Sequence, residues 1–343
     1  MNSFWSGKRV LITGVCGTVG RELLRQIATL DVAEIIGIDN NESELFFVSD
    51  EHSADGRVRL YVADIRNVHS LNQHLDGIDI VLHSAAFKHV ILCEQSPDEA
   101  IETNILGTQN VIRAALRNNV ERVLFTSSDK AVNPTNVMGT SKLMCERLMT
   151  AANAHRRDDG TIFASTRFGN VLGSRGSVIP LFKQQIQSGG PITLTDRRMT
   201  RFIMTLEEAV RLVMESTSLA RGGEVFVTKM PVVRIPDLAQ VMIQELAPKY
   251  GYDPEDIEID IIGSKPGEKL YEELMNEEET RRTVELPEYF AALPAFKAVY
   301  NEIRYEYPDM GELGIDRAYS SQNETALGIE ELREYLNQHH LLS

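Results

Sequence analysis

Cysteine, tryptophan and long hydrophobic runs are scarce in this sequence of 343 residues. The three cysteines are Cys16, Cys93 and Cys145, and none has C-x-x-C spacing, so we expect neither a disulfide framework nor a zinc site. No stretch of about 18 apolar residues occurs, so we expect no membrane-spanning helix. The first residues also lack the apolar run of a signal peptide, and we therefore expect a cytoplasmic protein.

Basic residues are in the minority as well. The chain has 35 Lys and Arg against 50 Asp and Glu, which gives a formal net charge of −15. A surface with this charge repels nucleic acids and anionic membranes, so we expect neither as a partner. An anionic small molecule would need a local basic pocket.

What the sequence does contain is an alternation of short apolar runs with amphipathic segments. RVLIT at 9–13, EIIGID at 34–39 and RVLFT at 122–126 are typical of buried strands. The alternation predicts an α/β fold with a Rossmann-type, doubly wound parallel sheet.

The domain organisation follows from where this pattern loosens. We expect the Rossmann domain to cover residues 1–180, with later segments returning to it. Residues 181–343 would form a smaller mixed α/β lobe, which binds the substrate, and a C-terminal tail. The acidic run EELMNEEET at 272–280 predicts a solvated helix face.

A glycine motif, G-x-x-G-x-x-G, lies between the first expected strand and helix. Gly14 permits a tight turn, Gly17 lets the backbone approach a pyrophosphate, and Gly20 lets the helix pack closely on the sheet. The helix N-terminus, with Thr18 and Val19 in its first turn, offers N–H groups and partial positive charge to phosphates. Strand, motif and helix together predict dinucleotide binding.

An acidic residue ends the next expected strand. Asp39 can accept hydrogen bonds from both adenosine ribose hydroxyls and would repel a 2′-phosphate, which favours NAD over NADP. Capping a helix is its alternative role. Asp64, after the following strand, can reach the adenine amino group or simply form a turn.

The third group of polar residues follows the strand at 122–126. Ser127, Ser128, Asp129 and Lys130 should therefore lie at the carboxyl edge of the sheet, where ligands bind in open α/β folds. Lys142 should lie on the next helix. Many nicotinamide-dependent enzymes have Y-x-x-x-K here, but this chain has Met138 in place of the Tyr.

These features, with the loop HSAAFKHV (83–90) and Asn104, resemble the extended short-chain dehydrogenase/reductase superfamily. The ordered series S-S-D-K-A-V-N-P, R-F-G-N-V-L-G-S-R-G-S-V-I-P, D-R-R-M-T-R-F and K-P-G-E-K-L narrows the resemblance. Over nearly the whole chain, it is similar to the nucleotide-sugar 4,6-dehydratases that act on UDP-N-acetylglucosamine.

That resemblance implies a lyase with NAD as a recycling cofactor. The sugar is oxidised at C4, loses water across C5–C6 and regains the hydride at C6, which yields a 4-keto-6-deoxy sugar. The resemblance implies that Asp129 protonates the departing hydroxyl and that Lys130 removes the C5 proton. Ser127 or Ser128 would bind the C4 oxygen, and Lys142 would bind the nicotinamide ribose.

The expected roles require a neutral Lys130 and a protonated Asp129. Burial favours both neutral forms, whereas an adjacent ion pair opposes both shifts. Proton transfer between the two side chains would reconcile these effects. The branch of the family with Met at the position of Met138 resembles dehydratases that retain the C5 configuration, so we expect retention. The C4 hydroxyl proton would go to Asp129 or to an ordered water, and the sequence leaves both open.

The resemblance also implies further contacts. Added cofactor-binding residues are Ile65, Ala85, Ala86, Lys88, Asn104 and Lys142. Implied substrate-binding residues are Lys88, His89, Asn170, Arg175, Val178, Arg201 and Glu268. A homo-oligomer is expected, with the segments 99–119 and 142–153 as candidate subunit contacts.

Four alternatives remain open. A C5-inverting dehydratase and a GDP-sugar 4,6-dehydratase share these motifs. A nucleotide-sugar epimerase would keep the Tyr that Met138 replaces and usually lacks the S-D-K pair. A non-enzymatic NAD-binding regulator would have eroded substrate motifs, whereas here they are intact.

Overall fold

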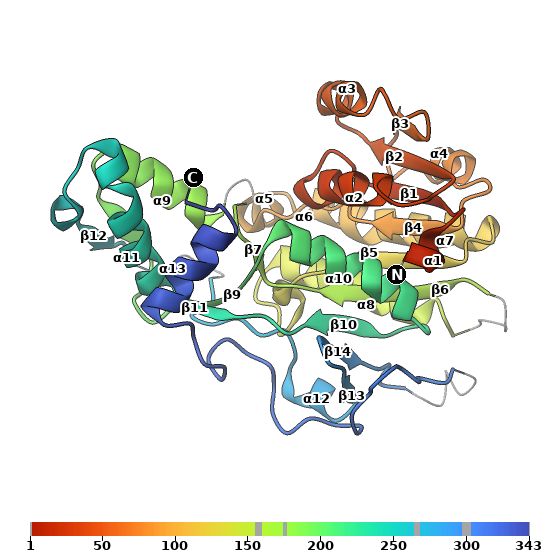
Figure 1. The fold of residues 1–343 in the computed structure, drawn as a ribbon. Helices are drawn as coiled ribbons and strands as arrows, with labels where there is room; N and C mark the ends of the chain where they lie inside the picture. The colour runs from red at the N-terminus through yellow and green to blue at the C-terminus, as the bar shows by residue number, and fades with distance from the viewer. Residues whose placement is uncertain (1, 155–159, 174–176, 264–267, 297–302, 343) are drawn as a thin grey trace.

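The computed structural model describes residues 2–154, 160–173, 177–263, 268–296 and 303–342 (Figure 1). These residues build a nine-stranded sheet with the strand order β13-β14-β10-β6-β5-β4-β1-β2-β3. All neighbours from β10 to β3 are parallel, whereas β14 is antiparallel to both β10 and β13. The sheet confirms the predicted doubly wound α/β fold.

The strands of the large sheet are β1 Arg9–Thr13, β2 Glu34–Asp39, β3 Val58–Val62, β4 Ile80–His83, β5 Arg122–Thr126, β6 Ile162–Arg167, β10 Val225–Thr228, β13 Thr283–Glu285 and β14 Tyr289–Ala292. The helices associated with it are α1 Asn2–Trp5, α2 Thr18–Ala28, α3 Glu42–Glu51, α4 Val68–His74, α5 Val90–Gln95, α6 Pro97–Ala100, α7 Gly107–Arg117, α8 Val137–Ala151 and α10 Leu206–Leu219. A π-helix at Ile101–Leu106 joins α6 to α7, within the helical segment expected at 99–119.

Helices cover both faces of the sheet, as Figure 1 shows. Val10 and Ile12 of β1 pack into the core on the side of α2 and α10, whereas Leu11 packs on the side of α4, α7 and α8. Successive residues of a strand point to opposite faces. Because both faces are buried, the parallel strands read in the sequence as continuous apolar runs.

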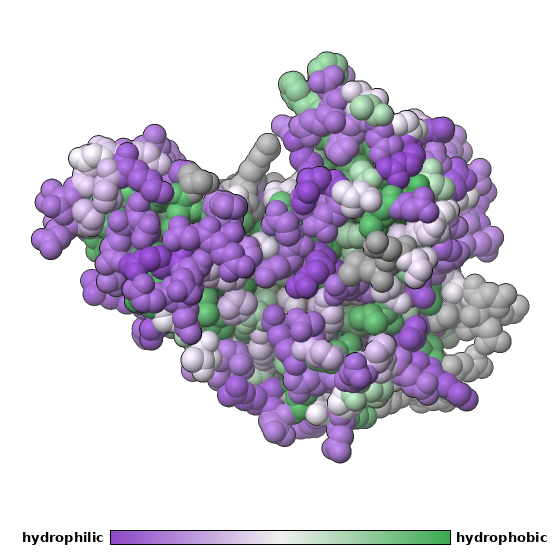
Figure 2. Space-filling model, in the orientation of Figure 1, coloured by the Kyte–Doolittle hydropathy of each residue, from purple (hydrophilic) through white to green (hydrophobic). Residues whose placement is uncertain are grey.

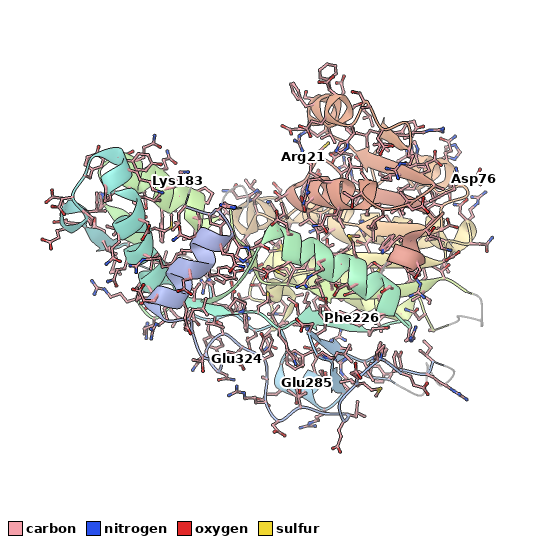
Figure 3. The ribbon with its side chains drawn as sticks, viewed as in Figure 1. Arg21, Asp76, Lys183, Phe226, Glu285 and Glu324 are labelled. Carbon is pink, nitrogen blue, oxygen red and sulfur yellow. The ribbon has the colours of Figure 1, made fainter. Side chains whose placement is uncertain are left out.

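A smaller lobe lies beside the carboxyl edge of these strands. Its elements are β7 Asn170–Val171, α9 Val178–Gln187, β8 Ile192–Leu194, β9 Thr200–Met204, β11 Val232–Arg234, α11 Ile235–Leu246, β12 Ile259–Ile261 and α13 Ile329–Gln338. Side chains from these elements form a second hydrophobic core. In Figure 3, Lys183 marks α9 in this lobe and Phe226 marks β10 in the sheet.

The two parts of the molecule interleave in the sequence. After residue 180 the chain returns to the large sheet twice, once as α10 and β10 and again as β13 and β14. The space-filling view shows a largely hydrophilic surface that is hollowed between the small lobe and the sheet (Figure 2).

The structure contradicts the prediction that the acidic run at 272–280 forms a solvated helix face. Only α12, Glu277–Thr280, is helical, and both Glu272 and Glu279 are buried. Arg167 at the end of β6 donates to both carboxylate oxygens of Glu279, each at 2.8 Å, and to those of Glu146 on α8, at 2.8 and 2.6 Å. Burial of these carboxylates depends on a distant arginine, which the local sequence pattern does not reveal.

Candidate active site

The glycine motif forms the tight turn that the sequence predicts. Gly14 has a φ of +71°, and a Cβ there would lie 2.7 Å from the Cα of Ala85, so the turn packs directly on the loop after β4. A Cβ on Gly20 would collide with the carbonyl oxygen of Gly14. Gly17 is the N-cap of α2 and has no side chain with which to cover the helix end.

Asp39 lies at the end of β2, facing this turn. Its carboxylate accepts hydrogen bonds from the backbone amides of Cys16 and Asn41, each at 3.0 Å. A cavity of about 340 Å³ opens here, between the glycine turn and the ends of the neighbouring strands. Its lining includes the predicted residues Gly14, Gly17, Asp39, Asp64, Ile65, Ala85 and Ala86. The closely packed glycine turn and a fixed carboxylate fit the adenosine half of a dinucleotide.

Other predicted cofactor residues have different surroundings. Asp64 is paired with Arg66 at 2.7 Å, which lowers the pKa of the Asp64 carboxyl. Val19 packs against the hydrophobic core. Lys88, His89 and Thr18 line a second cavity, of about 620 Å³, next to the N-terminus of α2.

Asn104 is buried in the π-helix and links two segments through hydrogen bonds. Its side-chain oxygen accepts from the Phe87 amide at 2.8 Å, and its side-chain nitrogen donates to Ser141 Oγ at 2.8 Å. It thereby joins the loop after β4 to α8.

Lys142 of α8 is buried beneath the end of β5. Its Nζ donates to the carbonyl oxygen of Thr126 at 3.0 Å and lies 4.7 Å from the centre of the Phe125 ring. Burial lowers the pKa of Lys142 to about 8. Met138, one turn earlier on α8, is buried in a small apolar cluster with Cys93 and Ala100.

The S-S-D-K stretch turns sharply at the end of β5. Lys130 Nζ contacts the two carboxylate oxygens of Asp129 at 3.1 and 3.0 Å, and Ser128 Oγ donates to the same carboxylate at 2.5 Å. The Oγ of Ser127 is buried and has no hydrogen-bond partner within the described ranges. Ser127 is not among the residues that line the cavities described above and below.

The surroundings of the pair act on its protonation in opposite directions. Burial raises the pKa of Asp129, but the charge of Lys130 and the Ser128 hydrogen bond outweigh burial, so the net pKa is lowered. Burial lowers the pKa of Lys130, but the charges of Asp129 and Glu272 raise it to above its usual value. Ion pairing thus outweighs burial and favours the charged form of both side chains.

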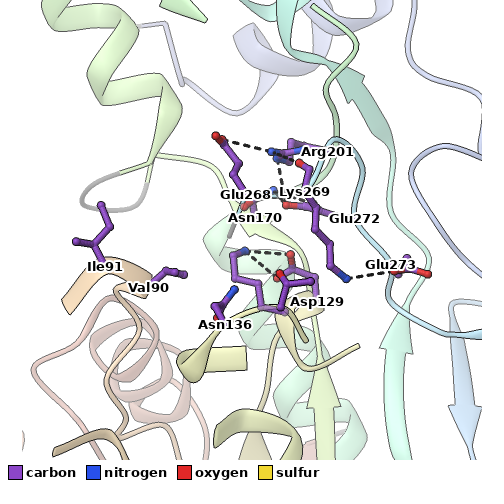
Figure 4. Close-up of a pocket in the computed structure, with 12 residues that line it drawn as sticks. Val90, Ile91, Asp129, Asn136, Asn170, Arg201, Glu268, Lys269, Glu272 and Glu273 are labelled. Carbon is purple, nitrogen blue, oxygen red and sulfur yellow. Dashed lines mark hydrogen bonds and ion pairs between the residues drawn. The ribbon is translucent and has the colours of Figure 1, made fainter. Parts of the chain in front are cut away.

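A cavity of about 310 Å³ lies over the ion pair, between the sheet and the small lobe (Figure 4). The predicted residues in its lining are Asp129, Lys130, Asn170, Arg201 and Glu268. An adjoining cavity of about 280 Å³ shares Asn170, Arg201 and Glu268 and extends to Val178 in the small lobe. Arg175 lies outside the described residues.

Glu272 is a pocket residue that the sequence did not single out. Asn170 Nδ2 donates to its two carboxylate oxygens at 2.8 and 2.9 Å, and Arg201 Nε lies 3.3 Å from one of them. Arg201 also lies 3.7 Å from Glu268. The sequence signal was present, because Glu272 closely follows the K-P-G-E-K-L motif, but its acidic neighbours suggested a solvated surface.

Comparison with known proteins assigns the chain to one family. Residues 10–294 match the family described as "Polysaccharide biosynthesis protein". An uncharacterised membrane protein of Methanocaldococcus jannaschii is 49% identical over 86% of this chain and 88% of its own length. Within the described ranges here, no helix is both long and apolar enough to cross a bilayer.

Two further relatives are enzymes or biosynthesis proteins by name. Capsular polysaccharide biosynthesis protein CapD of Staphylococcus aureus is 44% identical over 80% of this chain. The matched segment covers only 46% of the length of CapD. A UDP-glucose 4-epimerase of Rickettsia canadensis is 36% identical over 96% of this chain and 95% of its own length.

Solved structures share the fold. Pen from Bacillus thuringiensis superimposes with a TM-score of 0.90 at 42% identity, over 99% of this chain and all of that chain. The dTDP-glucose 4,6-dehydratase DesIV of Streptomyces venezuelae, at 24% identity, has a TM-score of 0.66 over 76% of this chain and 86% of that chain. The chain has a Rossmann-type fold and belongs to the polysaccharide biosynthesis protein family, and one of its relatives is named as a nucleotide-sugar epimerase.

Proposed function

We propose that this protein is an NAD-dependent UDP-N-acetylglucosamine 4,6-dehydratase that retains the configuration at C5. The observation that carries the proposal is the Asp129–Lys130 pair, which faces a cavity at the carboxyl end of β5. An acid and a base on adjacent residues suit the loss of water across one C–C bond, because both must reach neighbouring atoms of a single sugar ring.

The glycine turn and Asp39 would hold the adenosine and pyrophosphate of NAD, and Lys142 would contact the nicotinamide ribose. When bound, NAD would accept a hydride from C4 and return it to C6. The Asp39 carboxylate, fixed by Cys16 and Asn41, supports NAD over NADP because it would repel a 2′-phosphate.

The chain's own groups would handle the protons. Ser127 or Ser128 would hydrogen-bond the C4 oxygen. Lys130 would take the C5 proton, and Asp129 would give a proton to the departing C6 hydroxyl. Lys130 would then return its proton to C5.

The nucleotide would occupy the adjoining cavity of the small lobe. Arg201 and Asn170 lie where the two cavities meet and would contact the diphosphate. Glu268 would accept hydrogen bonds from the ribose hydroxyls. A UDP-sugar is supported by the relative named UDP-glucose 4-epimerase.

Retention at C5 rests on Met138. Its side chain cannot take the proton of the C4 hydroxyl, and it is buried against Cys93 and Ala100. A different group must therefore accept this proton, as in the branch of the family that has Met at this position.

A nucleotide-sugar epimerase is the second candidate, favoured by the Rickettsia epimerase that matches 96% of the chain. Oxidation and reduction at C4 alone would not use the Asp129–Lys130 pair. Met138 also lacks the ionisable group of the Tyr that epimerases keep.

The two candidates give products of different mass. The purified protein, incubated with UDP-N-acetylglucosamine and no added cofactor, should yield a nucleotide sugar that has lost one water. Asp129→Asn should lower the rate by about 10²–10⁴-fold, the usual contribution of a general acid. Arg317→Met, which removes an exposed ion pair, is the control. A product of unchanged mass would favour the epimerase.

We also infer a homo-oligomer. Ile101 and Leu106 of the π-helix, Leu116 of α7 and Met144 of α8 are exposed apolar side chains on neighbouring segments. A second copy of the chain would remove them from water.

A further inference from the structure

The ion pair presents a chemical difficulty for the proposed reaction. Lys130 must lose a proton before it can take one from C5, yet its ion pair with Asp129 raises its pKa. Asp129 is a poor store for that proton, because the net effect of its surroundings lowers its pKa. A third group that can hold the proton would remove the difficulty.

Glu272 is positioned to be this group. It is buried, with only 5% of its surface exposed, and lines the cavity together with Asp129 and Lys130 (Figure 4). Besides the two contacts from Asn170, it accepts a hydrogen bond from the Phe202 amide at 3.1 Å. These contacts hold its carboxyl group in one orientation.

The carboxyls of Glu272 and Asp129 line the same cavity and influence each other's ionisation. Glu272 is among the groups that lower the pKa of Asp129. Burial and the Asp129 charge raise the pKa of Glu272 to about 7, against the lowering effects of Lys130, Arg201 and the Asn170 hydrogen bond. Two carboxyls that share one buried site resist simultaneous ionisation, so Glu272 is the one that takes up a proton readily.

Substrate binding should strengthen this tendency. Arg201 is one of the two cations that keep Glu272 ionised, and it lies 3.3 Å from the Glu272 carboxylate. In the proposed complex, Arg201 contacts a diphosphate, whose negative charge offsets that of the guanidinium. The pKa of Glu272 then rises further.

We propose that Glu272 receives, by way of Asp129, the proton that Lys130 must release before it can act as the base at C5. The inference rests on the proposed function. One N–H bond of Lys130 breaks as an O–H bond forms on Asp129, and Asp129 passes a proton to Glu272. The three side chains keep a total charge of −1, and no other reactant is needed.

The transfer leaves each group in the form that the reaction requires. Lys130 is a neutral amine, and Asp129 is a carboxylate hydrogen-bonded by neutral Glu272. Asp129 can then accept the C4 hydroxyl proton when C4 is oxidised and give it to the C6 hydroxyl as the C–O bond breaks. Glu272 acts through Asp129 and is therefore a positioning residue.

Glu272→Gln separates this role from a structural one. A Gln side chain still accepts hydrogen bonds through its amide oxygen but cannot take up a proton. Infrared difference spectra of the protein, recorded with and without UDP at pH 7 to 8, report protonated carboxyl groups. Glu215→Gln is the matched control, because burial raises the pKa of Glu215 on α10, outside the cavity lining.

The expected result is a protonated-carboxyl band that appears when UDP binds to the wild-type protein and to Glu215→Gln, but not to Glu272→Gln. Turnover by Glu272→Gln should be low at pH 7 and recover as the pH rises, because Lys130 must then lose its proton to solvent. If Glu272→Gln fails to fold, Glu272→Asp keeps a carboxyl and should shift the frequency of the band.

Two outcomes distinguish the inference from the function on which it rests. If a folded Glu272→Gln showed the same UDP-induced band as the wild type, or the same pH profile of turnover, the proposed proton transfer to Glu272 would be wrong. A band that depends on Glu272, without turnover of any nucleotide sugar, would overturn the dehydratase and leave the proton transfer standing.

Discussion

At the scale of single residues, we propose that Asp39 decides the choice between NAD and NADP. Its carboxylate accepts hydrogen bonds from the amides of Cys16 and Asn41 and lines the cavity. We predict that Asp39→Asn weakens NAD binding by about 1.5–3 kcal/mol, or roughly 10- to 100-fold in Kd. NADP binding should weaken less, because the repulsion of the 2′-phosphate is also lost.

Calorimetric titration of both cofactors measures this difference. Asp55→Asn is the control, because Asp55 pairs with Arg57 at 2.6 Å and does not line the cavity. Equal weakening of NAD and NADP by Asp39→Asn would contradict the role assigned to Asp39.

The sequence predicted the residues whose role depends on local chain geometry. Gly14 and Asp39 lie where a strand, a turn and a helix must place them, and the structure brings them to one cavity. Glu272 could not be found in this way. Its pKa and its partners Asn170 and Arg201 depend on segments about 70 to 100 residues away, which fold over it.

At the scale of elements, the buried cation of Arg167 joins three segments. Its guanidinium connects β6 to Glu146 of α8 and to Glu279 of α12, all fully buried. We predict that Arg167→Met lowers the free energy of unfolding by about 3–5 kcal/mol, because it leaves two buried carboxylates without a cation. Urea unfolding, followed by circular dichroism, measures the change.

An exposed arginine supplies the comparison for this prediction. Arg317 pairs with Glu324 at 3.0 Å at the surface, and such pairs contribute roughly 0–1 kcal/mol. Similar urea midpoints for Arg167→Met and Arg317→Met would show that the buried network adds little stability.

Helix and strand patterns were predicted where the hydrophobic period was long and regular. The pattern at 99–119 is helical, but the π-helix at Ile101–Leu106 inside it has no sequence signal that we used. The acidic run at 272–280 was expected to be a solvated helix face, which is wrong for Glu272 and Glu279, because acidic residues usually face water unless a distant cation pairs with them.

At the scale of the whole molecule, the interleaved chain sets the position of the site. The cavity over Asp129 is closed by Arg201 and Glu268 from segments that leave the large sheet and return to it. The sequence led us to expect that later segments return to the Rossmann domain, but not which ones. The return of β10, β13 and β14 to the sheet depends on pairing between strands far apart in the chain.

The exposed apolar side chains of the π-helix, α7 and α8 make the oligomer testable. We predict that Met144→Glu shifts the protein to a smaller species in sedimentation velocity, because a charge would be buried between subunits. Phe46→Glu on α3, where Phe46 is 70% exposed, should leave the assembly unchanged. A single unchanged species for Met144→Glu would exclude this face as the subunit contact.

In the proposed reaction, Asp129 and Lys130 remove water from a nucleotide sugar. Proton NMR of the reaction with UDP-N-acetylglucosamine in D₂O, without added cofactor, tests this role. We predict a product with a 4-keto group, a 6-methyl group and a solvent deuteron at a C5 of retained configuration, and none of this product with Lys130→Met. A sugar changed only at C4, with C5 still protonated, would contradict it.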